Sequence, residues 1–214
     1  MTEGLIYTLG LVSLIILTAT HWFDPFLVHK GSPRRYRLVL IIFFSLLLVT
    51  QGLYLPVIPG YAVNLSGIII PVIVCLVRLW RFPPGQMWQM GAVILFLALF
   101  YAVSYQVLLM DPILMIISPR YLFPIVFTLM ILLVTKEWPS IWFLMASGMI
   151  GGELLHQGFL LEHAVLVQVG DGAFRDQLLL GLVLVSVSSI TLSFLVKAGQ
   201  VIKKVFADKE KSVT

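Results

Sequence analysis

The chain has 214 residues, of which 60% are hydrophobic and only 11% are charged. A soluble domain carries about a quarter charged residues, so this composition excludes an ordinary soluble protein and indicates one whose apolar side chains face a lipid bilayer. The net charge of +4 does not indicate a nucleic-acid partner, because the basic residues lie in short runs between apolar stretches rather than on one soluble face.

Seven apolar stretches are long enough for membrane-spanning helices, which need about 20 residues each. They are residues 4–22, 37–56, 63–80, 88–110, 119–135, 139–160 and 177–196. The sequence therefore predicts an all-α fold, a polytopic transmembrane helical bundle over residues 1–196. A basic cytoplasmic tail, residues 197–214, is expected to follow it. The connecting loops are too short to hold a separate soluble domain.

The basic residues divide unevenly between the two sides of such a bundle. With seven spans, one side holds 12 of the 14 Lys and Arg residues: Lys30, Arg34, Arg35, Arg37, Arg78, Arg81, Lys136, Lys197, Lys203, Lys204, Lys209 and Lys211. Cytoplasmic loops of membrane proteins carry an excess of Lys and Arg, so the N-terminus is predicted outside and the C-terminus inside. The fifth span is the weakest prediction. Residues 113–118 before it are interpreted as a short interfacial or re-entrant segment.

The sixth stretch carries the most informative polar residues, Glu153, His156 and Gln157. An acid at the centre of a membrane helix costs at least about 2.5 kcal/mol on insertion scales, and it therefore marks a candidate functional site. Glu153 and His156 are three residues apart and share one helical face, which Gln157 extends. A Glu–His pair can share or relay a proton, because imidazole titrates near neutrality.

Three interpretations of this polar face remain open: hydrogen bonds that hold helices together, a substrate or proton pathway, and a metal or catalytic site. A carboxylate-bridged metal centre needs a second Glu-x-x-His motif, and a zinc protease needs His-Glu-x-x-His; the sequence contains neither. We therefore expect no metal and no cofactor, and a small binding or transport module rather than an enzyme. The alternatives are an intramembrane enzyme acting on a lipid or peptide, and a structural subunit of a larger membrane complex.

The same stretch contains four small residues, Ser147, Gly148, Gly151 and Gly152. They form two small-x-x-x-small pairs, which allow helices to approach closely. We expect this face to pack against another helix of the chain. The alternative is contact with a second copy or with another membrane protein.

Further polar residues fall near the predicted outer ends of the spans. They are Gln51, Gln106, Asp111, Arg120 and His163. Together they form a second candidate group, which would line an outward-facing cavity.

The chain is small, consists almost entirely of spans and carries the sequence Gly-Gly-Glu-Leu-Leu-His at residues 151–156. In these features it resembles the YphA family of small membrane proteins of Bacillus-type bacteria. The resemblance implies a multi-pass protein of the bacterial plasma membrane. That family offers no activity, cofactor or site residue to carry over.

Overall fold

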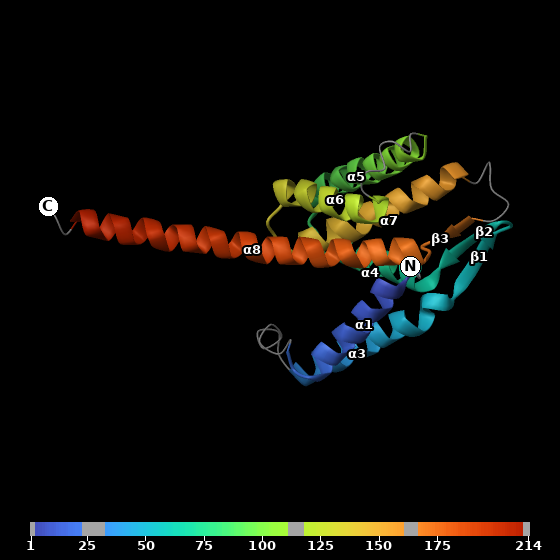
Figure 1. Cartoon of the computed structure of the whole chain (residues 1–214), viewed down its shortest axis with the longest axis horizontal. Coiled ribbons are helices and arrows are strands. Elements are labelled where there is room, and N and C mark those ends of the chain that lie inside the picture. Colours follow the sequence, from blue (N-terminus) through green and yellow to red (C-terminus); the bar gives the residue numbers. More distant parts are fainter. Residues whose placement is uncertain (1–2, 23–32, 111–117, 161–166, 212–214) are drawn as a thin grey trace.

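The computed structural model describes residues 3–22, 33–110, 118–160 and 167–211, and these are mostly helical (Figure 1). The described residues form seven α-helices and three strands. In chain order the elements are α1 (Leu5–Ala19), α3 (Pro33–Val49), a 3₁₀ turn (Thr50–Gly52), β1 (Tyr54–Ile58), β2 (Tyr61–Asn64), a π-helical turn (Leu65–Ile69), α4 (Ile70–Leu79), α5 (Pro84–Met110), α6 (Pro119–Val134), α7 (Trp138–Leu160), β3 (Val167–Val169) and α8 (Gly172–Lys211).

Each predicted span overlaps one of these helices, but the helices differ in length. Within the described residues, three helical stretches are long and apolar enough to cross a membrane: Arg34–Gly52, Pro84–Met110 and Gly172–Val196. Leu5–Ala19, Leu65–Leu79 and Pro119–Val134 are shorter apolar helices. A 15-residue helix is about 22 Å long, against about 30 Å for the hydrocarbon core of a bilayer. The number of full crossings and their orientation therefore stay predictions.

Helix α7 lies at the centre of the bundle. It packs most extensively against α5 and also contacts α8, α4 and α6. Four of its side chains, Ile141, Leu144, Met145 and Met149, are completely buried. Helix α7 has 23 residues, but it is neither one of the three long apolar helices nor one of the three shorter ones. The helix that carries the ionisable pair thus occupies the position with the most protein neighbours, where polar groups are sheltered from lipid.

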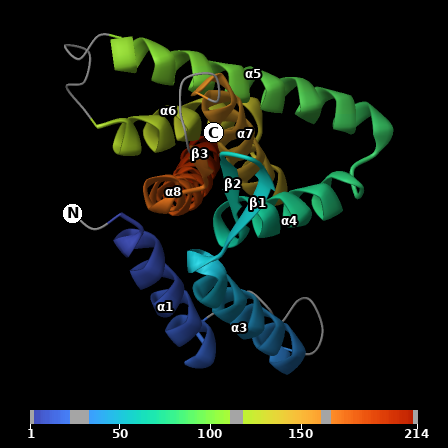
Figure 2. The same cartoon turned by 90° about the vertical axis from the view of Figure 1, so that its right-hand side faces the viewer.

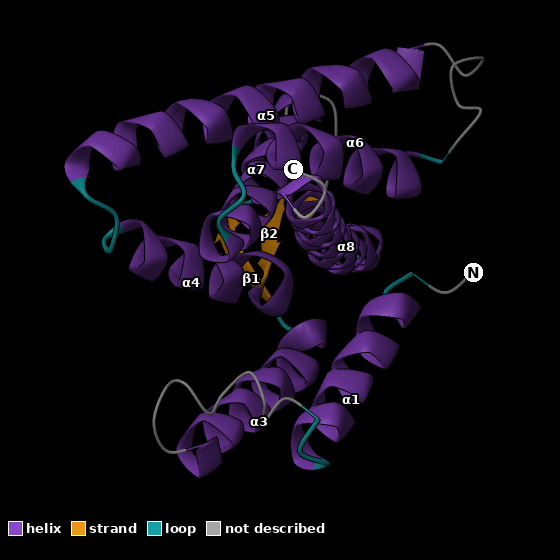
Figure 3. Cartoon of the chain, turned by 90° about the vertical axis from the view of Figure 1, so that its left-hand side faces the viewer, coloured by secondary structure: helices purple, strands orange, loops and turns teal. Residues whose placement is uncertain are grey.

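Helices α1 and α3 pack side by side and lie on the opposite side of the molecule from α5 (Figures 2 and 3). Tyr7 and Leu11 of α1 form a small core with Leu47 of α3. This helix pair joins the bundle through the contact of α1 with α8. At that contact the Leu179 side chain fills the space beside Gly10, where an added Cβ would lie 2.2 Å from Leu179 Cδ2.

A three-stranded sheet interrupts the helices, so the fold is mostly helical rather than all-α. The predicted second span, residues 37–56, is too long at its end: α3 stops at Val49, and β1 begins at Tyr54. Pro56 and Pro59 explain this difference, because a proline inside a helix removes a hydrogen bond and clashes with the preceding turn. Gly60, with φ of 80°, makes the turn into β2. Strand β2 pairs antiparallel with β1 and parallel with β3.

Helix α8 is longer at both ends than the predicted seventh span, residues 177–196. It begins at Gly172, where Asp171 Oδ1 accepts a hydrogen bond from the Phe174 backbone N–H at 2.8 Å and caps the helix. It continues to Lys211, so most of the predicted tail, residues 197–214, lies on the same helix. Figure 1 shows the C-terminal half of α8 extending well beyond the other helices.

Candidate functional site

The buried ionisable residues of α7 lie in its C-terminal half. Glu153 and His156 are each only 3% exposed. Gln157 Nε2 donates a hydrogen bond to Glu153 Oε1 at 2.9 Å. The hydroxyl of Tyr101, on α5, lies 3.2 Å from Glu153 Oε2. The same hydroxyl lies 3.2 Å from Oε1 of Gln177, on α8. Glu153 is thus connected to two neighbouring helices through one tyrosine.

Gln177 extends this connection to a fourth helix. Its side chain is 4% exposed, and its Nε2 donates a hydrogen bond of 3.4 Å to the Pro119 carbonyl at the start of α6. We call Tyr101, Glu153, His156, Gln157 and Gln177 the α7 polar site. Its residues come from α5, α7 and α8, and its hydrogen bonds reach α6.

His156 lies in the same site without a hydrogen bond to Glu153 in the part of the chain that the structure describes. Its Nδ1 atom is buried and has no hydrogen-bond partner there. Its ring packs against Tyr105, with 4.1 Å between ring centroids, and Tyr105 in turn stacks on Phe123. Glu153 and His156 share a helical face, as the sequence indicates. The imidazole of His156 nevertheless lies among aromatic rings and does not bond to the Glu153 carboxyl group.

Glu153 has no cationic partner among the described residues. The ion pair found there joins Arg120 and Asp176 instead. An isolated ionised carboxylate in an apolar environment is strongly disfavoured unless it is paired or gives up its charge. The side-chain partners of Glu153 are the neutral groups of Gln157 and Tyr101, which satisfy hydrogen bonds but supply no positive charge.

A second polar cluster lies at the N-terminal ends of α1 and α8. Asp176 is completely buried and accepts hydrogen bonds from the backbone N–H groups of Gly4, at 2.8 Å, and Tyr7, at 2.5 Å. Arg120, at the start of α6, forms its ion pair with the same carboxylate. The free N–H groups at a helix N-terminus favour a negative charge. Asp176 therefore holds α1 and α6 against α8.

Arg175 connects this cluster to the residues that precede α4. Its guanidinium bonds to the Gln51 carbonyl, which also accepts a 2.9 Å hydrogen bond from Asn64 Nδ2. Gln51 and Arg120 were predicted to line an outward-facing cavity. Here the Gln51 carbonyl accepts from Arg175 and Asn64, and Arg120 pairs with Asp176. Gln106 is half-buried on α5, and Asp111 and His163 lie outside the described residues.

Three of the four glycines of α7 face α5 of the same chain. A Cβ on Gly152 would lie 2.5 Å from Tyr101 Cβ. On Gly148 it would lie 3.0 Å from Leu97 Cβ, and on Gly151 it would lie 3.1 Å from Ala98 Cβ. These contacts bring α7 close to α5, and they place Tyr101 beside Glu153. A packing role for Ser147 stays a prediction. Contact with a second copy stays a prediction.

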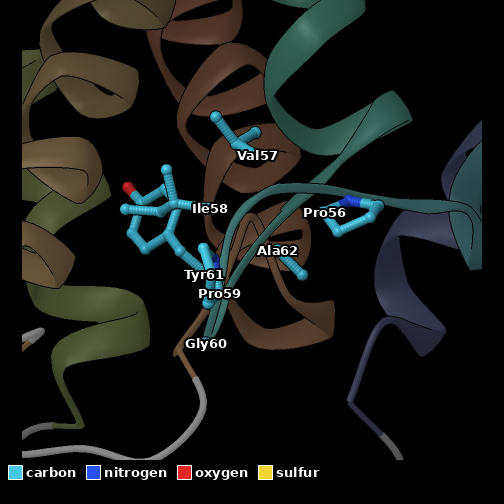
Figure 4. Close-up of a pocket in the computed structure, with 7 residues that line it drawn as sticks. All are labelled: Pro56, Val57, Ile58, Pro59, Gly60, Tyr61 and Ala62. Carbon is cyan, nitrogen blue, oxygen red and sulfur yellow. The ribbon is translucent and has the colours of Figure 1, made fainter.

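Two surface hollows lie away from the α7 polar site. Figure 4 shows the first, whose lining residues, Pro56 to Ala62, all belong to the β1–β2 hairpin. The second lies between the ends of α1 and α3 and is lined in part by Arg34 and Arg37. Neither includes Glu153 or His156. Across the described residues, no group of three or more His, Cys, Asp or Glu side chains could hold a metal ion.

Tyr101 and Gln177 are the site residues that the sequence did not single out. Tyr101 lies in the fourth span near three other polar residues, Ser104, Tyr105 and Gln106, and nothing in the sequence distinguishes it from them. Gln177 stands at the boundary of the seventh span, where a polar residue is ordinary. The one feature of the sequence that could have pointed to Gln177 is its place directly after the charged residues Arg175 and Asp176.

The family model of the YphA-like integral membrane proteins matches residues 5–211. The chain therefore belongs to that family and is an integral, multi-pass membrane protein. Neither the curated proteins nor the solved structures gave a match to the chain.

Proposed function

We propose that this YphA-like integral membrane protein is a small binding or transport module, and that its α7 polar site handles a proton or a small polar ligand. The observation that supports the proposal is Glu153, which is 3% exposed on the central helix and has no cationic partner among the described residues. Ionisable groups inside membrane proteins are costly and are concentrated at pathways and binding sites. The unpaired Nδ1 atom of His156 adds a second polar group that helix packing alone does not require.

The two alternatives, an intramembrane enzyme and a structural subunit, have less support. A general base must lie within about 2.6–3.2 Å of the atom whose proton it removes, directly or through one water. The described ring neighbour of His156 is Tyr105, and no hydrogen bond links His156 to a nucleophilic side chain in the described part of the chain. A structural subunit would have no need of a buried carboxyl group without a counter-ion.

Glu153→Gln is expected to abolish transport while keeping the shape and the Gln157 contact of the side chain. The purified protein is placed in liposomes that contain a pH-sensitive dye, and a potassium diffusion potential drives protons inward. Swelling of the same liposomes in urea or glycerol measures the passage of small neutral solutes. We expect wild-type protein to exceed protein-free liposomes in one of these assays, and Glu153→Gln to match them.

The matched control is Glu137→Gln, which removes an exposed carboxylate just before α7. This variant should keep the wild-type rate. Wild-type protein and Glu153→Gln giving the same rate in both assays would contradict the proposal.

We also propose seven crossings with the N-terminus outside. The support is the charge distribution: Arg34, Arg78 and Lys136 all lie near helix ends that alternating crossings bring to one side. In a Cys75→Ala background, Arg34→Cys and Lys211→Cys should be protected from an impermeant maleimide in intact cells and labelled after permeabilisation. Leu55→Cys, on the exposed hairpin, should be labelled without permeabilisation. Opposite behaviour of the first two positions would exclude an even number of crossings between them, and with it the seven-span arrangement.

A further inference from the structure

If Glu153 is ionised, the α7 polar site has one hydroxyl proton for two close contacts between oxygen atoms. The Tyr101 hydroxyl carries one proton, yet it lies 3.2 Å from two oxygen atoms, Glu153 Oε2 and Gln177 Oε1. An ionised Glu153 only accepts hydrogen bonds, so the single proton of Tyr101 would serve one of the two oxygens. The other would face the Tyr101 oxygen at 3.2 Å with no proton between the two atoms, although two acceptors at that distance repel each other.

Reorienting Gln177 does not remove the conflict. In the observed orientation its Nε2 donates to the Pro119 carbonyl at 3.4 Å, which leaves Oε1 toward Tyr101. Turning the amide over would place Oε1 against that carbonyl, so two acceptors would face each other. The Tyr101 proton is therefore needed by Gln177, and Glu153 Oε2 faces a lone pair of the Tyr101 oxygen.

We propose that the ligand of this site is a proton, carried by Glu153. The neutral carboxyl group donates from Oε2 to the Tyr101 oxygen, and the Tyr101 hydroxyl donates to Gln177 Oε1. Gln157 Nε2 continues to serve Glu153 Oε1. One additional proton thus satisfies every oxygen in the chain of hydrogen bonds and removes the unpaired charge from the bundle centre. The inference rests on the proposed function only in naming what this site binds.

Among the described residues, no group around Glu153 forms an ion pair with it. Tyr101 and Tyr105 face it from α5, His156 lies one turn along α7, and Asp171 before α8 and Tyr61 on β2 act on it electrostatically. The Gly170 backbone also reaches the carboxyl group, but a neutral amide does not balance a charge. Arg120 at the start of α6 is already paired with Asp176.

Infrared spectroscopy tests the protonation state directly. The protein is held at neutral pH in an ester-free detergent, so that no lipid ester hides the C=O stretching band of a protonated carboxyl group. We expect wild type to show this band and Glu153→Gln to lack it. Glu137→Gln, which removes an exposed carboxylate, should leave the band unchanged.

Tyr101→Phe provides a second measurement that keeps the carboxyl group in place. The variant removes the oxygen to which Glu153 donates, so the band should persist and move to higher frequency. A wild-type spectrum without any band sensitive to Glu153→Gln or Tyr101→Phe would overturn the inference. A band without proton or solute flux in liposomes would leave the inference standing and contradict the transport proposal. Flux without the band would support the transport proposal and contradict the inference that Glu153 carries a proton.

Discussion

Asp176→Ala is expected to lower the folding stability by about 3–5 kcal/mol, the range measured when one partner of a buried ion pair is removed. The change leaves Arg120 without its counter-ion and the Gly4 and Tyr7 N–H groups without their acceptor. Because these groups belong to α6 and α1, the loss should loosen both helices from α8. Thermal unfolding of the detergent-solubilised protein, followed by tryptophan fluorescence, measures the change.

Two comparisons make this test specific. Glu137→Gln removes the charge of an exposed carboxylate but keeps a side-chain oxygen that can accept from Ser140 Oγ, so it should change stability by no more than about 0.5 kcal/mol. The double variant Arg120→Met, Asp176→Leu removes both charges and should recover part of the lost stability, because a buried pair can be replaced by apolar side chains at little cost. An unfolding temperature for Asp176→Ala equal to that of Glu137→Gln would show that the buried pair does not hold these helices together.

Gly152→Ala is expected to destabilise the protein by about 1–3 kcal/mol, the usual cost of overfilling a packed core. The added methyl group would lie 2.5 Å from Tyr101 Cβ and 2.6 Å from its Cγ, positions close to the backbone of α5 that cannot move without shifting that helix. Tyr101 would then move away from Glu153, so the infrared band of the carboxyl group should change as well. Unfolding in increasing SDS, followed by circular dichroism, measures the stability.

Gly158→Ala is the matched control for this substitution. Gly158 lies on the same helix, and an added Cβ would meet nothing within 4 Å. Alanine is favoured over glycine inside a helix by about 0.5–1 kcal/mol, so this variant should be unchanged or slightly stabilised. The two substitutions are chemically identical and should act in opposite directions. If both stabilise the protein, α5 and α7 do not approach as closely as the structure indicates.

The two clusters are adjacent on α8, where Asp176 binds the end of α1 and the next residue, Gln177, accepts from Tyr101. Consecutive residues on a helix project about 100° apart, so one turn of α8 serves both contacts. The Arg120–Asp176 pair also fixes the start of α6, whose Pro119 carbonyl orients the Gln177 amide. Asp176 is therefore a positioning residue for the α7 polar site.

The sequence by itself determined the class of protein and the helix that carries the polar face. Apolar stretches of bilayer length are local features, and an acid with a histidine three residues later marks one helical face wherever that helix packs. Family membership confirmed the integral membrane class, and the structure placed a helix over each predicted stretch. Glycine spacing on α7 likewise indicated close packing, because the size of a residue is a property of the residue itself.

Only the tertiary structure decided which groups meet. Glu153 and Tyr101 are 52 residues apart in the chain, and Tyr101 and Gln177 are 76 apart, so no local pattern relates them. The hairpin was missed because Leu55 and Val57 are as apolar as helix residues, and it forms because Pro56 and Pro59 exclude a helix there. His156 shares the predicted face with Glu153 and yet packs on Tyr105, since the ring follows the space that the neighbouring helix leaves. Periodicity sets the face of a helix, whereas its partners depend on how the helices are packed together.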